Sequence, residues 1–100
     1  KPVLNRPNLK VEVKALTQNV TFEGKRATGV VYEQGGEKKT ALASKEVILC
    51  GGAVNTPQTL LLSGIGDPEY LQKWNIPVVS PLKGVGQNLQ DHLDVTVQFE

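Results

Sequence analysis

The amino-acid sequence predicts a mixed α/β (α+β) fold in which an antiparallel β-meander leads into a buried strand and short helices. Three observations support this prediction. Short runs of alternating apolar and polar residues occupy residues 1–45, a continuous apolar run follows at 47–50, and leucine-rich segments with helix-capping residues come next. Alternation is typical of strands with one buried face, whereas a continuous run is typical of a strand buried on both faces.

The meander is expected to contain four short strands. The alternating runs cover 9–14, 20–22, 27–33 and 38–43. Gly24 follows the second run, and the Gln-Gly-Gly-Glu segment at 34–37 separates the third from the fourth. Glycine takes positive φ without steric cost, so both places are expected to be turns.

The run Val47–Cys50 is expected to form a strand buried on both faces, as in a parallel sheet. A helix should follow, with Thr56 as its N-cap and Pro57 in its first turn, where a missing N–H costs nothing. Glycine at 64 and 66 should end it.

A second short helix is expected from Asp67 or Pro68 through Trp74, with Asn75-Ile76-Pro77 ending it. Residues 78–79 read as extended, and 82–93 as irregular and rich in turns.

The stretch most informative about chemistry is Glu46–Gly66, in which the buried strand runs into Gly51-Gly52-Ala53 and then into the helix start near Thr56. Small residues let a ligand approach the backbone closely, and a helix start favours an anion such as a pyrophosphate. Ligands in open α/β sheets bind at this edge. The alternative is a strand–turn–helix corner that binds nothing. The sequence contains no G-x-G-x-x-G, so the main dinucleotide loop is not in it.

Composition excludes several classes of function. The formal net charge is +1 and the lysines are scattered, so nucleic acid is not an expected partner. A single cysteine gives no disulfide framework, and one histidine with one cysteine gives no metal site. No apolar run approaches the roughly 20 residues that span a bilayer.

The stretch GAVNTPQTLLLSGIG at 52–66 resembles the second signature of the glucose-methanol-choline oxidoreductases, FAD enzymes that oxidise alcohols. Thr59 departs from it, standing where an aliphatic residue is usual. Further blocks in family order lie at 8–9, 22–24, 26–27, 29–30, 46–49 and 84–92. Residues 43–49 and 84–93 are similar to choline-oxidising members of the family.

The resemblance implies an internal piece of an FAD-binding, Rossmann-like domain. It divides the chain into a β-meander at 1–45, a strand–turn–helix signature at 46–66, a helix and loop at 67–93, and the start of a substrate-domain strand at 94–100. The absence of methionine and the alternating pattern that continues to Glu100 favour the same interpretation.

By resemblance, Cys50, Gly51, Gly52 and Ala53 match the strand-end loop near the ADP half of FAD. Cys50 is expected to be a buried small hydrophobe and not a reactive thiol. Thr17 aligns with a position, usually valine, whose backbone contacts the adenine ring; the alternative is an ordinary turn residue between strands.

Asp94 follows Asp91-His92-Leu93, where choline-oxidising members of the family place a glutamate. A quaternary ammonium group cannot donate a hydrogen bond, so charge and aromatic faces must hold it, and a carboxylate meets that need. Aspartate is one methylene shorter, and the alternative is a solvated carboxylate. The family's catalytic histidine lies beyond Glu100, so His92 is expected to be structural or near the cofactor, and no catalytic residue is predicted here.

The resemblance implies oxidation of choline to betaine aldehyde by hydride transfer to FAD. Two alternatives remain: a family member acting on a neutral primary alcohol, and a non-catalytic module that lacks flavin. The expected partners are the small-molecule alcohol and the remainder of a parent chain. The electron acceptor is not predicted, and a mitochondrial, inner-membrane-associated location is implied by resemblance alone.

Overall fold

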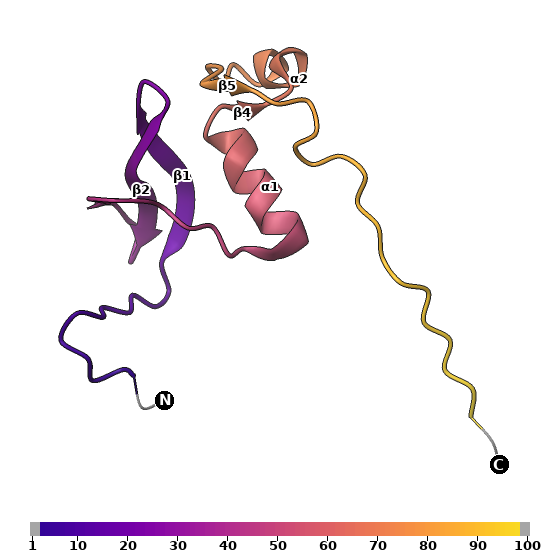
Figure 1. The fold of residues 1–100 in the computed structure, drawn as a ribbon, viewed down its shortest axis with the longest axis horizontal. Helices are drawn as coiled ribbons and strands as arrows, with labels where there is room; N and C mark the ends of the chain where they lie inside the picture. The colour runs from indigo at the N-terminus through magenta and orange to yellow at the C-terminus, as the bar shows by residue number, and fades with distance from the viewer. Residues whose placement is uncertain (1–2, 99–100) are drawn as a thin grey trace.

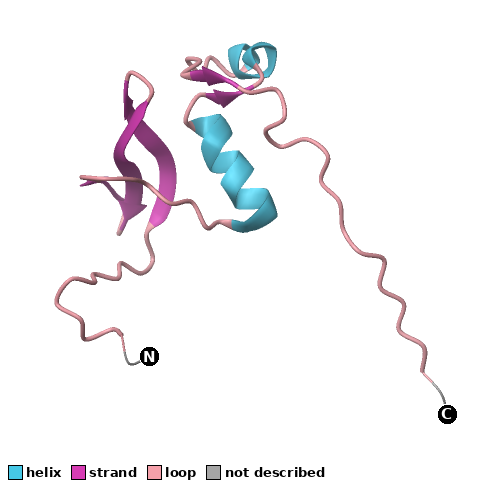
Figure 2. Ribbon diagram, in the orientation of Figure 1, coloured by secondary structure: helices cyan, strands magenta, loops and turns pink. Residues whose placement is uncertain are grey.

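The computed structural model describes residues 3–98 and shows a small antiparallel sheet beside two helices (Figures 1 and 2). The elements in chain order are β1 (Leu16–Glu23), β2 (Arg26–Gln34), β3 (Glu37–Leu42), α1 (Gly52–Leu62), β4 (Ile65–Gly66), α2 (Pro68–Lys73) and β5 (Ser80–Pro81). The segments at the two ends run away from this body as irregular chain (Figure 1). The predicted mixed fold, with an antiparallel meander and short helices, is confirmed.

The meander pairs in the order β1-β2-β3, with both neighbouring pairs antiparallel. Its turns are where glycine predicted them: Gly24 has φ +58°, and Gly35 and Gly36 have φ +64° and +81°. The last three of the four predicted strands are therefore confirmed: β1 is longer than predicted, β2 is longer by one residue at each end, and β3 is shifted by one residue.

The prediction of a strand at 9–14 is wrong. Its apolar residues Leu9, Val11 and Val13 are exposed, and none of its residues joins the sheet. Side chains tether it instead: Gln34 Nε2 donates to Glu12 Oε2 at 3.2 Å and to the Val13 carbonyl at 3.0 Å. The hydrogen bond from Lys10, whose Nζ lies 2.6 Å from Glu12 Oε1, is the largest cause of a lowered pKa at Glu12.

The buried strand predicted at Val47–Cys50 does not form either. No described residue pairs with it, Ile48 is 73% exposed, and Cys50 is also exposed. The expectation that Cys50 is buried is therefore wrong. A strand needs a hydrogen-bonding neighbour, and an apolar run alone cannot supply one.

Helix α1 begins earlier than predicted, with Gly51 as its N-cap. Thr56 is inside the helix, where its Oγ1 accepts a hydrogen bond from the Gly51 N–H at 3.0 Å. Pro57 is also inside, so the carbonyl of Ala53 loses its usual i+4 partner. The predicted end is confirmed, because Ser63 is the C-cap and Gly64 follows with φ +81°.

Helix α2 has the predicted start and end. The Asp67 side chain caps it by accepting from the Glu69 N–H at 3.1 Å, and Pro68 opens its first turn. Strands β4 and β5 pair in parallel, a pairing that the sequence did not predict. The Gly64 carbonyl accepts from the N–H groups of Val79 and Ser80, which joins the end of α1 to this pair.

The described residues bury few side chains. Val20 on β1 is 5% exposed and Leu71 on α2 is 0% exposed, and they are the buried hydrophobic residues of this part of the chain. Helix α1 packs along β1, yet none of its described side chains is buried. Leu60, Leu61 and Leu62 thus belong to a helix that is covered on one side only.

Replacing Gly64 by alanine is expected to destabilise the fold by about 2–4 kcal/mol, because a left-handed backbone and a steric overlap both oppose a Cβ there. A Cβ at this position would lie 2.3 Å from the Pro77 carbonyl oxygen and 3.0 Å from Val79 Cγ2. Urea unfolding midpoints measure the change. Gly84→Ala is the matched control, since a Cβ at Gly84 meets nothing within 4 Å; equal midpoints for the two variants would contradict the packing seen at Gly64.

Across residues 3–98, neither helix has the length and apolar character needed to cross a bilayer.

Candidate functional site

The start of α1 presents backbone donors with little around them. Gly51, Gly52 and Ala53 are all exposed, and the first turn carries no acidic residue, although the Gly51 N–H already donates to Thr56 Oγ1. Gly52 has φ +78°, and a Cβ added there would meet nothing within 4 Å. The first N–H groups of a helix lack intrahelical partners and carry partial positive charge. In the predicted loop Gly51–Ala53, the N–H groups of Gly52 and Ala53 are therefore the candidates for contact with an anion.

A hollow of about 410 Å³ lies between β1 and the part of α1 that contains Gln58, Thr59 and Leu62, and Thr17 is among the residues that line it. It is lined by Leu16, Thr17, Gln18, Asn19, Gln58, Thr59 and Leu62. The register of β1 against β2 shifts between Thr17 and Asn19, so Gln18 is a bulge residue. Bulges bend a strand and re-aim its residues, here beside the hollow.

The structure thus brings Thr17 and Gly51–Ala53 to the same helix but to different turns of it. Thr17 lines the hollow together with Gln58, Thr59 and Leu62, whereas Gly51–Ala53 form the helix start.

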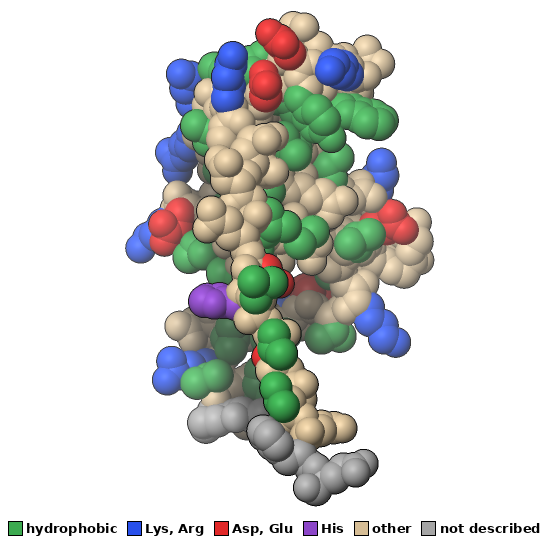
Figure 3. All heavy atoms as spheres, turned by 90° about the vertical axis from the view of Figure 1, so that its right-hand side faces the viewer, with side chains coloured by type: hydrophobic (Ala, Val, Ile, Leu, Met, Phe, Trp, Pro, Cys, Tyr) green, Lys and Arg blue, Asp and Glu red, His purple; other side chains and the backbone are tan. Residues whose placement is uncertain are grey.

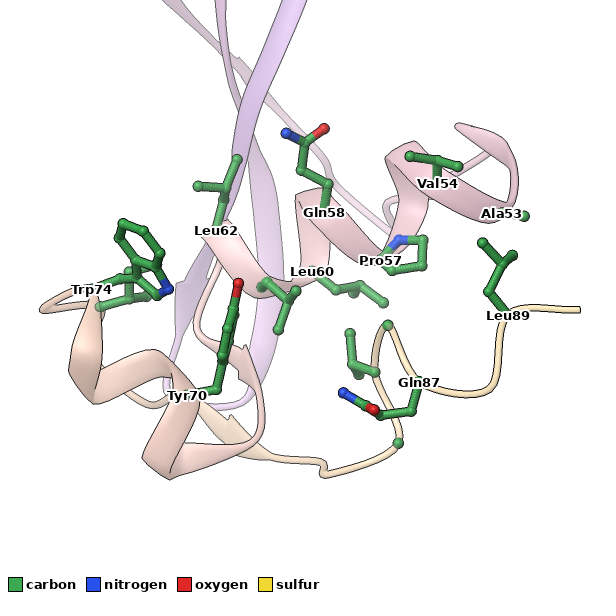
Figure 4. Close-up of a pocket in the computed structure, with 15 residues that line it drawn as sticks. Ala53, Val54, Pro57, Gln58, Leu60, Leu62, Tyr70, Trp74, Gln87 and Leu89 are labelled. Carbon is green, nitrogen blue, oxygen red and sulfur yellow. The ribbon is translucent and has the colours of Figure 1, made fainter.

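An apolar groove of about 900 Å³ runs along the other side of α1, between α1, α2 and the loop 84–89 (Figure 4). Figure 4 shows Leu89 facing the Ala53 end of the groove and Tyr70 facing the Leu62 end. The Tyr70 and Trp74 rings meet edge to face, with centroids 6.5 Å apart. Sequence analysis missed this groove, although the apolar residues at 60–62, 70 and 74 were the available signal.

Asp94 and His92 lie in the C-terminal tail, which the structure does not bring to the helix start (Figure 1). Both side chains are exposed, and the His92 backbone N–H donates to Asp91 Oδ1 at 2.8 Å. The strand expected to begin at 94 is not formed over 94–98, where Val95 and Val97 are exposed, and residues 99–100 lie outside the described residues. Figure 3 shows hydrophobic side chains along this tail.

Within residues 3–98, no group of three potential metal ligands comes together. The site residues present, which are small and uncharged at the helix start, suit an anionic organic cofactor.

Comparison with known proteins gives a consistent result. Residues 1–94 match the family model described as GMC oxidoreductase. The chain is 59% identical over 97 residues to the mitochondrial choline dehydrogenase of Mus musculus. It is 56% identical over 95 residues to an oxygen-dependent choline dehydrogenase of Chromohalobacter salexigens. These matches cover 97% and 95% of this chain but span only 16% and 17% of the two relatives.

Solved structures are similar to this chain as well. An FAD-dependent oxidoreductase from Chaetomium thermophilum matches with a TM-score of 0.86 and 44% identity, covering 90% of this chain and 16% of that one. A formate oxidase matches with a TM-score of 0.86 and 32% identity over the same shares.

Proposed function

This chain belongs to the GMC oxidoreductase family, and from that premise we propose that it forms part of an FAD-dependent enzyme that oxidises choline to betaine aldehyde. The observation that supports this most directly is identity of 50–59% to relatives named choline dehydrogenase, over nearly the whole chain. The relatives are much longer than this chain, so the activity is proposed for a larger protein that contains it.

The exposed apolar surface of this chain supports the proposal that it is part of a larger protein. Helix α1 buries none of its described side chains, and the apolar groove beside it is open. Large exposed apolar surfaces usually mark contacts with other protein segments. The run at 47–50, apolar yet unpaired here, has the pattern of a strand that would pair with neighbours elsewhere in the domain.

The residues proposed to hold FAD are those at the start of α1 and on β1. The backbone N–H groups of Gly52 and Ala53 would bind the pyrophosphate, with Cys50 and Gly51 at the entry to this loop; the Gly51 N–H itself donates to Thr56 Oγ1. The Thr17 backbone would contact the adenine ring from the hollow beside α1. When bound, the flavin supplies the chemistry by accepting a hydride from the alcohol carbon, and this chain's residues bind and orient it.

Asp94 is proposed to bind the substrate. Its carboxylate would attract the trimethylammonium group of choline, which offers no hydrogen-bond donor and is recognised by charge. The tail that carries it is extended over the described residues, so this role depends on the tail packing within the larger protein.

The partners proposed are the alcohol substrate and the remainder of the larger protein. The mouse and human relatives carry mitochondrial names, which supports a mitochondrial location, whereas the bacterial relatives are named oxygen-dependent. These names agree on choline, and only the bacterial ones name an acceptor, so we propose the substrate and no acceptor.

Anaerobic mixing of the purified, flavin-loaded full-length protein with choline tests the substrate. The control is choline's neutral carbon isostere, in which a tert-butyl group replaces the trimethylammonium group. Choline is expected to bleach the flavin absorbance at least about tenfold faster at equal low concentration, because one partly screened ion pair exceeds 1.4 kcal/mol. Faster bleaching by the isostere would assign the protein to neutral alcohols, and a purified protein without flavin would point to a non-catalytic module.

A further inference from the structure

One buried hydroxyl connects the sheet to α1. Ser63 Oγ accepts a hydrogen bond from the Val20 N–H at 2.8 Å and donates to the Thr59 carbonyl at 2.5 Å. Ser63 is 7% exposed and Val20 is 5% exposed, so water has little access to this contact. The two partners fix the direction of the hydroxyl, because a backbone N–H can only donate and a carbonyl can only accept.

This hydrogen bond has no substitute within the described residues. Strand β1 is an edge of the three-stranded sheet, and the Val20 N–H is directed to α1. Among residues 3–98, it is the one hydrogen bond between that sheet and α1. Removing the hydroxyl would leave a buried donor unsatisfied, which is costly.

The contact also adjoins the hollow that contains Thr17. Thr59, which accepts from Ser63, lines that hollow, and Leu62 does so from the preceding position. On the strand side, only Gln18 and Asn19 separate Val20 from Thr17, and the register of β1 shifts there. Movement at Ser63 would therefore shift Thr17 relative to α1.

We propose that Ser63 is a positioning residue for FAD binding. Its hydroxyl holds β1, which carries Thr17, against α1, which presents Gly51–Ala53, so that one dinucleotide can contact both. The inference rests on the proposed function, since it concerns the same cofactor. Ser63 lines neither the hollow beside β1 nor the apolar groove, so we expect it to act on cofactor affinity and not on the chemical step.

The test is a titration of FAD into the full-length apoprotein, for wild type and for Ser63→Ala. The variant is expected to bind FAD about tenfold more weakly, the size expected when a buried N–H loses its partner. At saturating FAD, its kcat and its KM for the alcohol should equal those of wild type. A lower kcat at saturation, or unchanged FAD affinity, would overturn the proposal.

Thr28→Ala is the matched control for general loss of stability. Thr28 shares a hydroxyl hydrogen bond with Thr21 across β1 and β2, at 3.1 Å, and is half-buried. It lines neither the hollow nor the helix start. This variant should keep wild-type FAD affinity even if its unfolding midpoint falls; an equal loss of affinity in both variants would show that Ser63 acts only through stability.

Two further variants serve if Ser63→Ala does not fold. Ser63→Cys is close in size but replaces the hydroxyl with a weak acceptor, and Ser63→Thr keeps the hydroxyl. Weaker FAD binding by the cysteine variant than by the threonine variant supports the proposal, and equal binding overturns it. A wild-type protein that binds no FAD would refute the proposed function and this inference together, whereas failure of the variants alone refutes only the inference.

Discussion

Replacing Ala53 by aspartate is expected to weaken FAD binding at least about a hundredfold, because two negative charges some 4 Å apart repel by several kcal/mol near a protein surface. Ala53 is exposed in the first turn of α1, next to the donors proposed to bind the pyrophosphate. The new carboxylate would occupy the region of positive potential that the anion needs. The measurement is a titration of the full-length apoprotein with FAD, followed by flavin fluorescence.

The same substitution should not damage the fold. A carboxylate in the first turn interacts favourably with the helix dipole, by about 0.3–1 kcal/mol, and this turn has no acidic residue of its own. Thermal unfolding of the apoprotein should therefore be unchanged or slightly later. This separates the variant from most site mutations, in which lost binding can simply reflect lost folding.

Ala53→Asn provides the control for size, because asparagine has nearly the shape of aspartate without its charge. It should lose much less affinity than the aspartate variant. If both lose affinity equally, the effect is steric and the start of α1 is not an anion site. If the aspartate variant binds FAD normally, the pyrophosphate lies elsewhere.

The parts of the fold that the sequence predicted are those fixed by local rules. Gly35 and Gly36 supply the turn between β2 and β3, Gly64 ends α1, and Asp67 with Pro68 starts α2. Each depends on residues within one or two turns of the chain. Local backbone preferences therefore sufficed for the turns of the meander, the end of α1 and both ends of α2.

The failures concern segments whose structure depends on distant partners. Residues 9–14 and 47–50 have strand patterns as clear as that of β2, yet neither pairs with a described strand. The pattern specifies which face would be buried, but a strand also needs a neighbour to hydrogen-bond. The prediction of Thr56 as the N-cap of α1 was also wrong. Its hydroxyl does accept a hydrogen bond from a backbone N–H at the helix start, but Thr56 itself is inside α1.

For the candidate site too, local sequence indicated some features, whereas contacts between distant residues could not be predicted. The glycines at 51 and 52 were predicted as a site from their small size, but the start of α1 was predicted at Thr56 and lies instead at Gly51 and Gly52. The contact between Ser63 and Val20 joins residues 43 apart in sequence, and no local pattern pairs them. The only signal was a polar residue at the end of a leucine-rich helix, which is equally typical of a C-cap.

Replacing Asp94 by asparagine is expected to lower kcat/KM for choline about a hundredfold, corresponding to loss of one partly desolvated ion pair. The neutral isostere should lose less than about threefold, because it gains nothing from the charge. Steady-state rates of the full-length enzyme with an artificial acceptor give both values. Asp94 is exposed and has no hydrogen bond within the described residues, so its substitution should leave the fold unchanged.

Asp94→Glu makes this test specific to charge. Glutamate keeps the carboxylate and adds the methylene that choline-oxidising relatives have, so it should retain choline oxidation to within a few-fold. Equal losses for choline and the isostere in the asparagine variant would show that Asp94 shapes the site without recognising the ammonium group. The charge of Asp94 then could not explain a preference for choline, and the aromatic faces of the larger protein would be the remaining way to recognise it.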